Sequence, residues 1–447
     1  EATVDINASA AITLAAANVP VTVGGIPFYY GDTGSIYTHN VSGTDDTAQY
    51  NTAYGLTSLD AITTGDNNTA VGFSAGGAVT TGASNVAIGY QALDNADAES
   101  HNVAIGKDTM GGPVNGGEYN VGIGGNAFAA LTSADNSVAV GYGAGAAVTT
   151  GGDNVILGKG AGAAMTTSNN CIAIGTGALD GAVGGCNSNI AIGTDALGAV
   201  VTSAGGGEEG RNNVAVGQSS GDAVTSGYWN TFVGNGSGGG VTTGNKNVHI
   251  GLNAGLALTT GTNTIFIGAQ AGDGHDTEIH NLAIGSAALG GSVAGGEYNV
   301  AIGNNSLDAL TSGDQNVAVG YDAGTAVTTA TNAVLIGYQA GSGLTTSNNC
   351  IGIGKGVFAG TATGDDNIVI GTGAGAAITS GDSNILIGSG TGDVLTTGTN
   401  NIAIGRQALD NTDAETHNLA IGTNALGGTI AGGEYNVSIG NSSLDAL

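Results

Sequence analysis

Hydrophobic and polar residues alternate in a five-residue pattern that recurs along most of the chain. Asn85–Gly89 and Asn102–Gly106 both read NVAIG, and residues 189–193 read NIAIG. Aligned on the final glycine there are 23 copies; 17 of the 22 steps between them are 17 residues long, four are 18, and one, from Gly193 to Gly217, is 24. So short and strict a period predicts an all-β parallel β-roll or β-solenoid of about 23 rungs, in which each repeat stacks on its neighbours.

Apolar residues occupy every second position of each copy. Val, Ile, Leu or Thr stands three residues before the glycine, and Ile, Val or Leu one residue before it in every copy except at Tyr54, mostly with Ala between them, as in Val86, Ala87 and Ile88. This alternation predicts a β-strand whose large side chains share one buried face, and alanine on the other face implies close packing there too. A second apolar patch in mid-repeat, AVTT or ALTS, predicts a second short strand, with turn formers such as TGDNN between them. We therefore expect a rung of two strands and two turns.

Asparagine forms a column of its own. It stands four residues before the glycine in 18 of 23 copies, where its side chain is expected to bond the turn backbone and to form a ladder with the next rung. Four residues after the glycine, eleven copies have Gly and twelve a large apolar residue, which suits a core position whose filling varies with its neighbours. The predicted structural ladders include Asn85, Asn102, Asn120, Ile88, Ile105, Ile302, Ile404, Gly89 and Gly106.

The charge of the chain limits its partners. The 447 residues include 35 acidic and 6 basic ones, for a formal net charge of −29, and 86 glycines. Such a surface repels nucleic acid, which needs Lys and Arg to displace its counterions, and it disfavours anionic membranes. The same charge keeps a long glycine-rich object soluble in salt. We expect an extracellular or virion-surface protein, with no nucleic-acid partner and no membrane insertion.

A single chain offers a small core. Several residues of each rung are spent on turns, and both faces of the predicted strand are apolar, so one face still needs a cover. A symmetric homo-oligomer around a common axis provides that cover. At ~4.8 Å per rung, 23 rungs would form a rod of roughly 110 Å.

Residues 1–46 do not follow the period. PVTVGG from Pro20 and PFYYGDTGSIYTH at Pro27–His39 predict a small β-rich cap or attachment segment, because a solenoid needs a cover over its first rung. Residues 47–447 then form the repeat shaft. The sequence stops at NSSLDAL, whereas the similar NNSLDAL at 304–310 runs on into another rung, so we expect the natural protein to continue.

NVAIGYQAL at Asn85–Leu93 and NIAIGRQAL at Asn401–Leu409 resemble known repeats. They are similar to the head repeats of trimeric autotransporter adhesins, and more similar to the 17-residue AIGYQAL arrays of bacteriophage tail fibres. The resemblance covers about Tyr50–Leu447 and implies a homotrimer, intertwined or side by side, attached to a virion or cell surface through its N-terminal segment. Adhesin heads have a shorter repeat. The longer step favours a tail-fibre shaft that spaces or presents a host-receptor-binding end, with the adhesin head as the alternative.

The repeat argues against catalysis. Twenty-three equivalent rungs without a unique catalytic cluster predict a structural and adhesive protein that is not an enzyme and needs no cofactor. GTGAGA from Gly371 and GKGAGA from Gly158 lack the lysine motif and the helix that a phosphate loop needs. Acidic turn residues are weak candidates for Ca²⁺, which prefers oxygen ligands, with solvated turns as the favoured alternative. These candidates are Asp66, Asp314, Asp366 and Asp382.

Histidines and cysteines recur at fixed places in the repeat. His101, His280 and His417 share one turn position, where three-fold copies are weak candidates for an ion site on an axis. Cys171 and Cys350 share another position ten rungs apart, too far for a disulfide, and Cys186 lies elsewhere in its repeat. We expect thiols or contacts between chains rather than a disulfide framework.

The one long step of the repeat is the predicted partner site. Its extra residues fall in Thr202–Arg211, TSAGGGEEGR, and must bulge from the stack. The next rung carries Tyr228 and Trp229 at its turn. Exposed aromatic rings beside a polar loop that includes Glu208 and Glu209 form a candidate platform for a host glycan; the alternative is a tolerated insertion beside an incidental aromatic residue.

Overall fold

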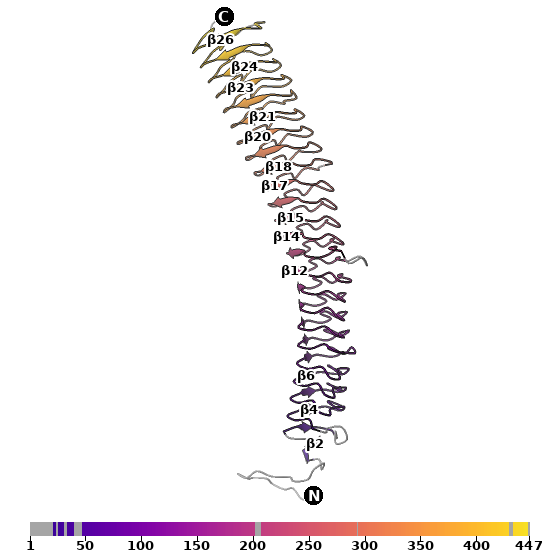
Figure 1. Cartoon of the computed structure of the whole chain (residues 1–447). Helices are drawn as coiled ribbons and strands as arrows, with labels where there is room; N and C mark the ends of the chain where they lie inside the picture. Colours follow the sequence, from indigo (N-terminus) through magenta and orange to yellow (C-terminus); the bar gives the residue numbers. More distant parts are fainter. Residues whose placement is uncertain are drawn as a thin grey trace, which may run out of the picture. The chain divides into compact units, whose positions relative to one another are not determined.

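The computed structural model describes residues 21–23, 26–30, 34–39, 47–201, 207–292, 294–428 and 432–445. The chain divides into two compact units, Glu1–Ala173 and Ile174–Leu447. Each unit is a parallel β-solenoid, which confirms the predicted all-β class and the 17-residue period (Figure 1). The described residues form strands, turns and bends but no helix, and so contain no helix of the length and apolarity that a membrane span requires.

Each repeat contributes one strand of three residues. Consecutive strands pair in parallel and in direct register, so that Val300 lies beside Val317 and Ile302 beside Val319. Such pairs join β4 to β10 in the first unit and β12 to β26 in the second. The strands are β1 Val21–Val23, β2 Ile26–Tyr30, β3 Ile36–Tyr37, β4 Thr52–Tyr54, β5 Thr69–Val71, β6 Val86–Ile88, β7 Val103–Ile105, β8 Val121–Ile123, β9 Val138–Val140, β10 Val155–Leu157, β11 Ile172–Ile174, β12 Ile190–Ile192, β13 Val214–Val216, β14 Thr231–Val233, β15 Val248–Ile250, β16 Ile265–Ile267, β17 Leu282–Ile284, β18 Val300–Ile302, β19 Val317–Val319, β20 Val334–Ile336, β21 Ile351–Ile353, β22 Ile368–Ile370, β23 Ile385–Ile387, β24 Ile402–Ile404, β25 Leu419–Ile421 and β26 Val437–Ile439.

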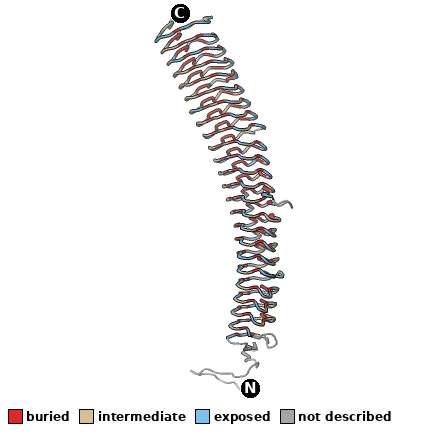
Figure 2. The backbone as a smooth tube through the Cα atoms, in the orientation of Figure 1, coloured by how far each residue is buried: buried red, intermediate tan, exposed pale blue. Residues whose placement is uncertain are grey.

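The large side chains one and three residues before the repeat glycine lie on the outer face of the strand, which corrects the prediction that they are buried. In β6 the middle residue, Ala87, is 2% exposed, whereas Ile88 is 36% exposed. Ile105, Ile302 and Ile404 also lie on this outer face. Figure 2 shows buried and exposed residues following one another around every rung. The prediction was wrong because a 17-residue rung is narrow: its interior takes the middle residue of the strand, and residues from the turns fill what remains.

The mid-repeat apolar patch is not a strand, so the prediction of two strands per rung was wrong. Positions are counted here from the repeat glycine as position 0. The chain enters the patch through a turn that is left-handed at +2 and +4, as in Gln91 (φ +52°) and Leu93 (φ +54°). The patch itself, at +6 to +9, reaches the next rung through bonds such as Thr80 N–H to the carbonyl of Asp97 at 2.9 Å, and among the described residues it forms isolated parallel bridges, such as Val183 with Val201, rather than a strand.

A buried asparagine ladder joins the rungs at position −4. The Oδ1 of Asn85 accepts the backbone N–H of Asn102 at 2.9 Å, and its Nδ2 donates to the carbonyl of Glu99 at 2.8 Å. Asn102 repeats both bonds toward Asn120 and Gly117. Each side chain thus satisfies a buried donor and a buried acceptor of the next rung, which would otherwise be left unpaired at a cost of about 1–3 kcal/mol each.

The repeat glycine allows the rungs to stack closely. Gly89 has φ +134°, and a Cβ built on it would lie 2.4 Å from the carbonyl oxygen of Gly106, while Gly106 meets Gly124 in the same way. Backbone lies against backbone at this point, so no side chain can be accommodated. Glycine is therefore required by both its conformation and its surroundings.

The core keeps its volume by pairing positions −2 and +4. Where −2 is large, as with Phe232 or Leu386, +4 is glycine; a Cβ on Gly238 would lie 2.5 Å from the Phe232 ring. Where −2 is Gly122, +4 is the fully buried Phe128. Side chains at +4 also fill space for the adjoining rung. The alternation that the sequence displays at +4 therefore reflects close packing across the rung.

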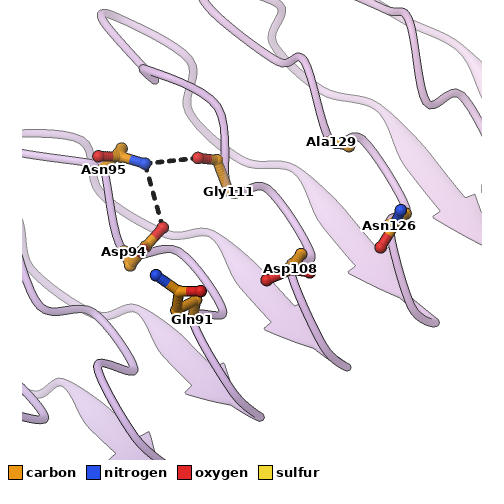
Figure 3. Close-up of a pocket in the computed structure, with 7 residues that line it drawn as sticks. All are labelled: Gln91, Asp94, Asn95, Asp108, Gly111, Asn126 and Ala129. Atoms are coloured by element: carbon orange, nitrogen blue, oxygen red, sulfur yellow. Dashed lines mark hydrogen bonds between the residues drawn. The ribbon is translucent and has the colours of Figure 1, made fainter.

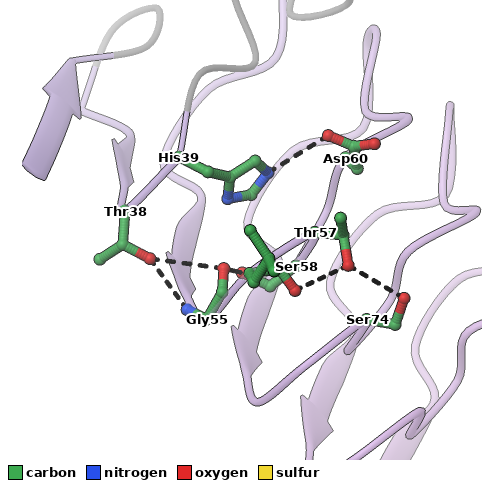
Figure 4. Close-up of polar contacts among 8 residues, drawn as sticks. Thr38, His39, Gly55, Thr57, Ser58, Asp60 and Ser74 are labelled. Carbon is green, nitrogen blue, oxygen red and sulfur yellow. Dashed lines mark hydrogen bonds and ion pairs between the residues drawn. The ribbon is translucent and has the colours of Figure 1, made fainter.

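An antiparallel segment leads into the first full rung. β1 pairs with β2 and β2 with β3 in antiparallel fashion, and β3 then pairs in parallel with β4. Thr38 Oγ1 accepts the N–H of Gly55 at 2.9 Å, and His39 Nε2 lies 3.5 Å from Asp60 Oδ1 (Figure 4). Most of the predicted cap, residues 1–46, lies outside the described residues, so the cap stays a prediction.

Candidate functional site

A polar pocket of about 230 Å³ opens on the first unit (Figure 3). Gln91, Asp108 and Asn126 contribute from position +2 of three successive rungs, and Asp94, Gly111 and Ala129 from position +5, with Asn95 completing the wall. Positions +2 and +5 face each other across the turn that follows every strand. The backbone at +2 is left-handed in each of these rungs. Because the turn has the same shape in successive rungs, the side chains at +2 form one row and those at +5 another.

Hydrogen bonds preorganise one wall of the pocket. Asn95 Nδ2 donates to Asp94 Oδ1 at 3.1 Å and to the carbonyl of Gly111 at 2.5 Å. Burial raises the pKa of Asp94, with a smaller contribution from Asp108, while a hydrogen bond with Gln91 opposes the rise. At the rim, Lys107 Nζ lies 3.1 Å from Asp108 Oδ2. The pocket is thus lined by amide and carboxylate groups, which suit hydrogen bonding to a polar ligand.

The sequence analysis did not find this pocket. Nothing in the sequence distinguishes Asp94 and Asp108 from the acidic residues of other turns. The signal that was present is the run of small residues, Gly111 and Ala129, at +5 in the two rungs after Asp94.

A second surface is the outer sheet face, defined as positions −3 and −1 of each rung. The exposed large side chains of this face range from 36% exposed at Ile88 to 66% at Ile439, the others are half-buried, and the face is mostly apolar along each unit. Beside it, at +1, Phe73 stacks on Tyr90 at 5.4 Å and Tyr321 on Tyr338 at 5.5 Å. Its exposed large members are Tyr54, Val71, Ile88, Ile123, Val155, Ile192, Ile250, Ile265, Ile336, Ile402, Ile404, Val437 and Ile439. An apolar face of this kind is a candidate interaction surface.

The four acidic Ca²⁺ candidates do not come together. Asp66, Asp314 and Asp382 stand at one turn position, where Oδ1 of each accepts a backbone N–H of the preceding rung at 2.7–2.8 Å. Asp366 stands at −5 and accepts from the side chain of Asn349 at 3.1 Å. These contacts account for the carboxylates as links between rungs. In the described part of the chain, no three His, Cys, Asp or Glu side chains are grouped to hold a metal ion.

The structure brings the predicted aromatic pair together. Tyr228 and Trp229 meet edge to face at 5.4 Å, Trp229 is 47% exposed, and Lys246 lies 5.5 Å from the centre of its ring. Glu208 accepts a bond from Asn212, which occupies the turn position of Trp229 one rung earlier. Residues 202–206 of the bulge lie outside the described residues. Lys246 covers part of the indole, and a glycan platform at this turn, including Glu209, stays a prediction.

The repeated histidines and the cysteines are packing residues. His101 stacks on Tyr119, as do His280 on Tyr298 and His417 on Tyr435, with ring centres 4.7–4.8 Å apart. The three cysteines, Cys171, Cys186 and Cys350, are buried thiols. Burial raises the pKa of Cys350 to about 11, so this thiol stays protonated at neutral pH and is a poor nucleophile.

Two histidines lie inside the core of the second unit. His249 replaces the usual small residue at −2 and stacks on Phe266 at 4.9 Å, and Phe266 in turn contacts His275 at 5.1 Å. His249 Nε2 bonds Thr264 Oγ1 at 2.9 Å. Burial lowers the pKa of His249 to about 3, and His275 adds to this; burial lowers the pKa of His275 to about 4, against the field of Glu278.

Acid is expected to destabilise the second unit through these imidazoles. As pH falls from about 6.5 toward 4, the unfolded chain binds protons that the folded chain does not, so the free energy of unfolding falls by about 1.4 kcal/mol per pH unit for each histidine. His275→Leu should reduce this slope, since Leu258 and Leu310 hold the same position. Urea unfolding from pH 7 to 4.5 measures it. His417→Asn, at an exposed turn, serves as control; equal slopes in both variants would contradict the assignment.

No protein-family model matches the chain, and no curated protein matches it.

Proposed function

We propose that the chain is the structural and adhesive shaft of an extracellular or virion-surface fibre, and not an enzyme. The observation that carries this proposal is the repetition of equivalent rungs in both units, most of them adding an outward apolar pair to the outer sheet face of their unit. A stack of this kind spans distance and displays one surface repeatedly. The resemblance to phage tail-fibre arrays favours a tail-fibre shaft that spaces or presents a host-receptor-binding end.

The alternative is a bacterial surface adhesin head of the trimeric autotransporter type. The downstream sequence separates the two: a chaperone or receptor-binding tip indicates the tail fibre, and a membrane anchor indicates the adhesin. In either case the N-terminal segment is proposed to attach the shaft to a virion or cell surface.

Self-association follows from the outer sheet face. A homotrimer that packs these faces around a common axis would cover residues such as Ile402 and Ile404, each 38% exposed in the chain. The face carries few charges in a chain of net charge −29, so it can approach a copy of itself without strong repulsion. Copies with the same rung spacing also match along their whole length.

The proposal predicts thin, unbranched rods in electron micrographs and the mass of three chains in sedimentation equilibrium. Ile404→Asp should weaken association at least tenfold, because a trimer would bury the new carboxylate without a partner, while the single chain leaves it half-exposed. Thr346→Asp, on an exposed turn, is the matched control and should assemble normally. Compact particles would refute the shaft, and monomers or dimers of the parent protein would refute the trimer.

A further inference from the structure

The pocket on the first unit exists because two residues in succession are small. Asp94 opens a run at position +5 in which the next two rungs supply Gly111 and Ala129. A Cβ built on Gly111 would have as its nearest neighbours only the backbone of Asp108, at 3.3 Å and beyond. The hollow above Asp94 therefore remains open between the side chains at +2 and the turn backbone.

The second unit contains the same turn in a closed form. Its corresponding runs at +5 are Asp273, Gly290, Asp308 and Asp410, Gly427, Asp445. A Cβ on Gly290 would lie 2.9 Å from Oδ1 of Asp308, and one on Gly427 would lie 2.8 Å from Oδ1 of Asp445. In both places a carboxylate from the third rung occupies the space that Ala129 leaves empty. The turn in the first unit therefore differs from its two counterparts in the second unit by this open space.

The groups around the opening favour a neutral ligand. The amides of Gln91 and Asn126 supply both donors and acceptors, whereas Asn95 supplies only its Oδ1 because its Nδ2 already donates two hydrogen bonds. Asp94 supplies further acceptors. The carboxylate of Asp108 is already paired with Lys107, so the place of a cation is taken by the chain itself. Lys107 also lies 5.9 Å from the centre of the Tyr90 ring, which holds it at the rim. A divalent cation would find one unpaired carboxylate, whereas adjacent hydroxyl groups would find matched donors and acceptors.

We propose that this pocket binds one neutral sugar ring through two adjacent hydroxyl groups held by Asp94 and Asn95, with Asn126 lining the opposite end of the pocket (Figure 3). A volume of about 230 Å³ is below the roughly 300–1,000 Å³ of pockets that hold drug-sized ligands, which suits a single ring. One shallow contact binds weakly, and a homotrimer would present three copies, so that a surface glycan is held by several weak contacts together. The biological role of the pocket rests on the proposed adhesive function.

Saturation-transfer NMR on the purified chain tests the binding directly. The probes are the methyl pyranosides of glucose, galactose, mannose and N-acetylglucosamine, each at millimolar concentration. At least one should receive saturation, and Ala129→Asp should weaken its binding about tenfold or more, because the new carboxylate fills the hollow as Asp308 does in its own rung. Ala163→Asp is the matched control: it places the same residue at the same position two rungs away, outside the pocket, and should bind like the parent.

The outcomes separate the two proposals. Absence of saturation for all four sugars overturns the sugar site, and so does binding that survives Ala129→Asp or is lost equally in Ala163→Asp. Backbone amide shifts around Asp94 and Asp108 that respond to CaCl₂ and not to any sugar would assign a cation site instead and overturn the proposal. The micrographs and the sedimentation measurement do not depend on sugar binding. If no sugar binds, the proposed shaft is therefore not refuted. If the chain forms no rods or trimers, the sugar measurement still tests the pocket.

Discussion

Gly371→Ala is expected to destabilise the second unit by about 3–5 kcal/mol, which is at the upper end for a single substitution. Gly371 has φ +139°, and a Cβ there would lie 2.3 Å from the carbonyl oxygen of Gly388 and 2.5 Å from its carbon. Both neighbours are backbone, so the two rungs would have to separate where β22 ends. That separation stretches the adjoining hydrogen bonds, including Gly371 N–H to the carbonyl of Ile353 at 2.8 Å.

Gly373→Ala is the matched control for this substitution. Gly373 lies two residues further along the same rung, also with positive φ (+65°), but nothing lies within 4 Å of its Cβ. Its counterpart Gln91 shows that a side chain is tolerated at +2, so the cost should be about 1 kcal/mol. Urea unfolding followed by circular dichroism measures both free energies. If the two variants lose equal stability, then rung stacking is not limited by the repeat glycine.

The period determined how much of the fold could be predicted. A step of 17 residues repeated over 23 copies leaves few architectures other than stacked rungs, so the parallel pairing and strand positions followed from the spacing alone. Which face of the strand is buried did not follow from the spacing. Val86, Ala87 and Ile88 are apolar on both sides, and alternation then identifies a strand without saying which side is inside. The width of the rung decides that, and this width depends on turns whose left-handed residues, such as Leu93, have no distinctive sequence signal.

The candidate site was harder to predict for a different reason. The acidic residues that the sequence offers as candidates, Asp66, Asp314 and Asp382, accept hydrogen bonds from the backbone of adjacent rungs in the structure. The pocket depends on the small side chain of Ala129. The groups that line the pocket with it include Asp94 and Asn95, which lie 30 or more residues away in the chain. An empty space of this kind can be recognised only once the rungs are stacked in register.

Exchanging the core residues of one rung should show the volume rule directly. Leu386 at −2 is fully buried, and a Cβ on Gly392 at +4 would lie 2.9 Å from its Cδ1. Leu386→Ala alone should cost about 2–5 kcal/mol by leaving a cavity. Gly392→Leu alone should cost about 1–3 kcal/mol or more, because the new side chain enters space that Leu386 already fills.

The double variant Leu386→Ala/Gly392→Leu should recover most of this loss. It recreates the arrangement of the next rung, where Ala403 at −2 faces Leu409 at +4, both fully buried, and Leu409 has the φ of +59° that the new leucine would need. The double-mutant cycle should therefore give a favourable coupling of about 2 kcal/mol or more, as expected for side chains that share one cavity. Urea unfolding provides the three differences, and hydrogen exchange of Ile385–Ile387 reports the same rung locally. Strictly additive losses would mean that the two positions pack independently, and that the alternation at +4 has another cause.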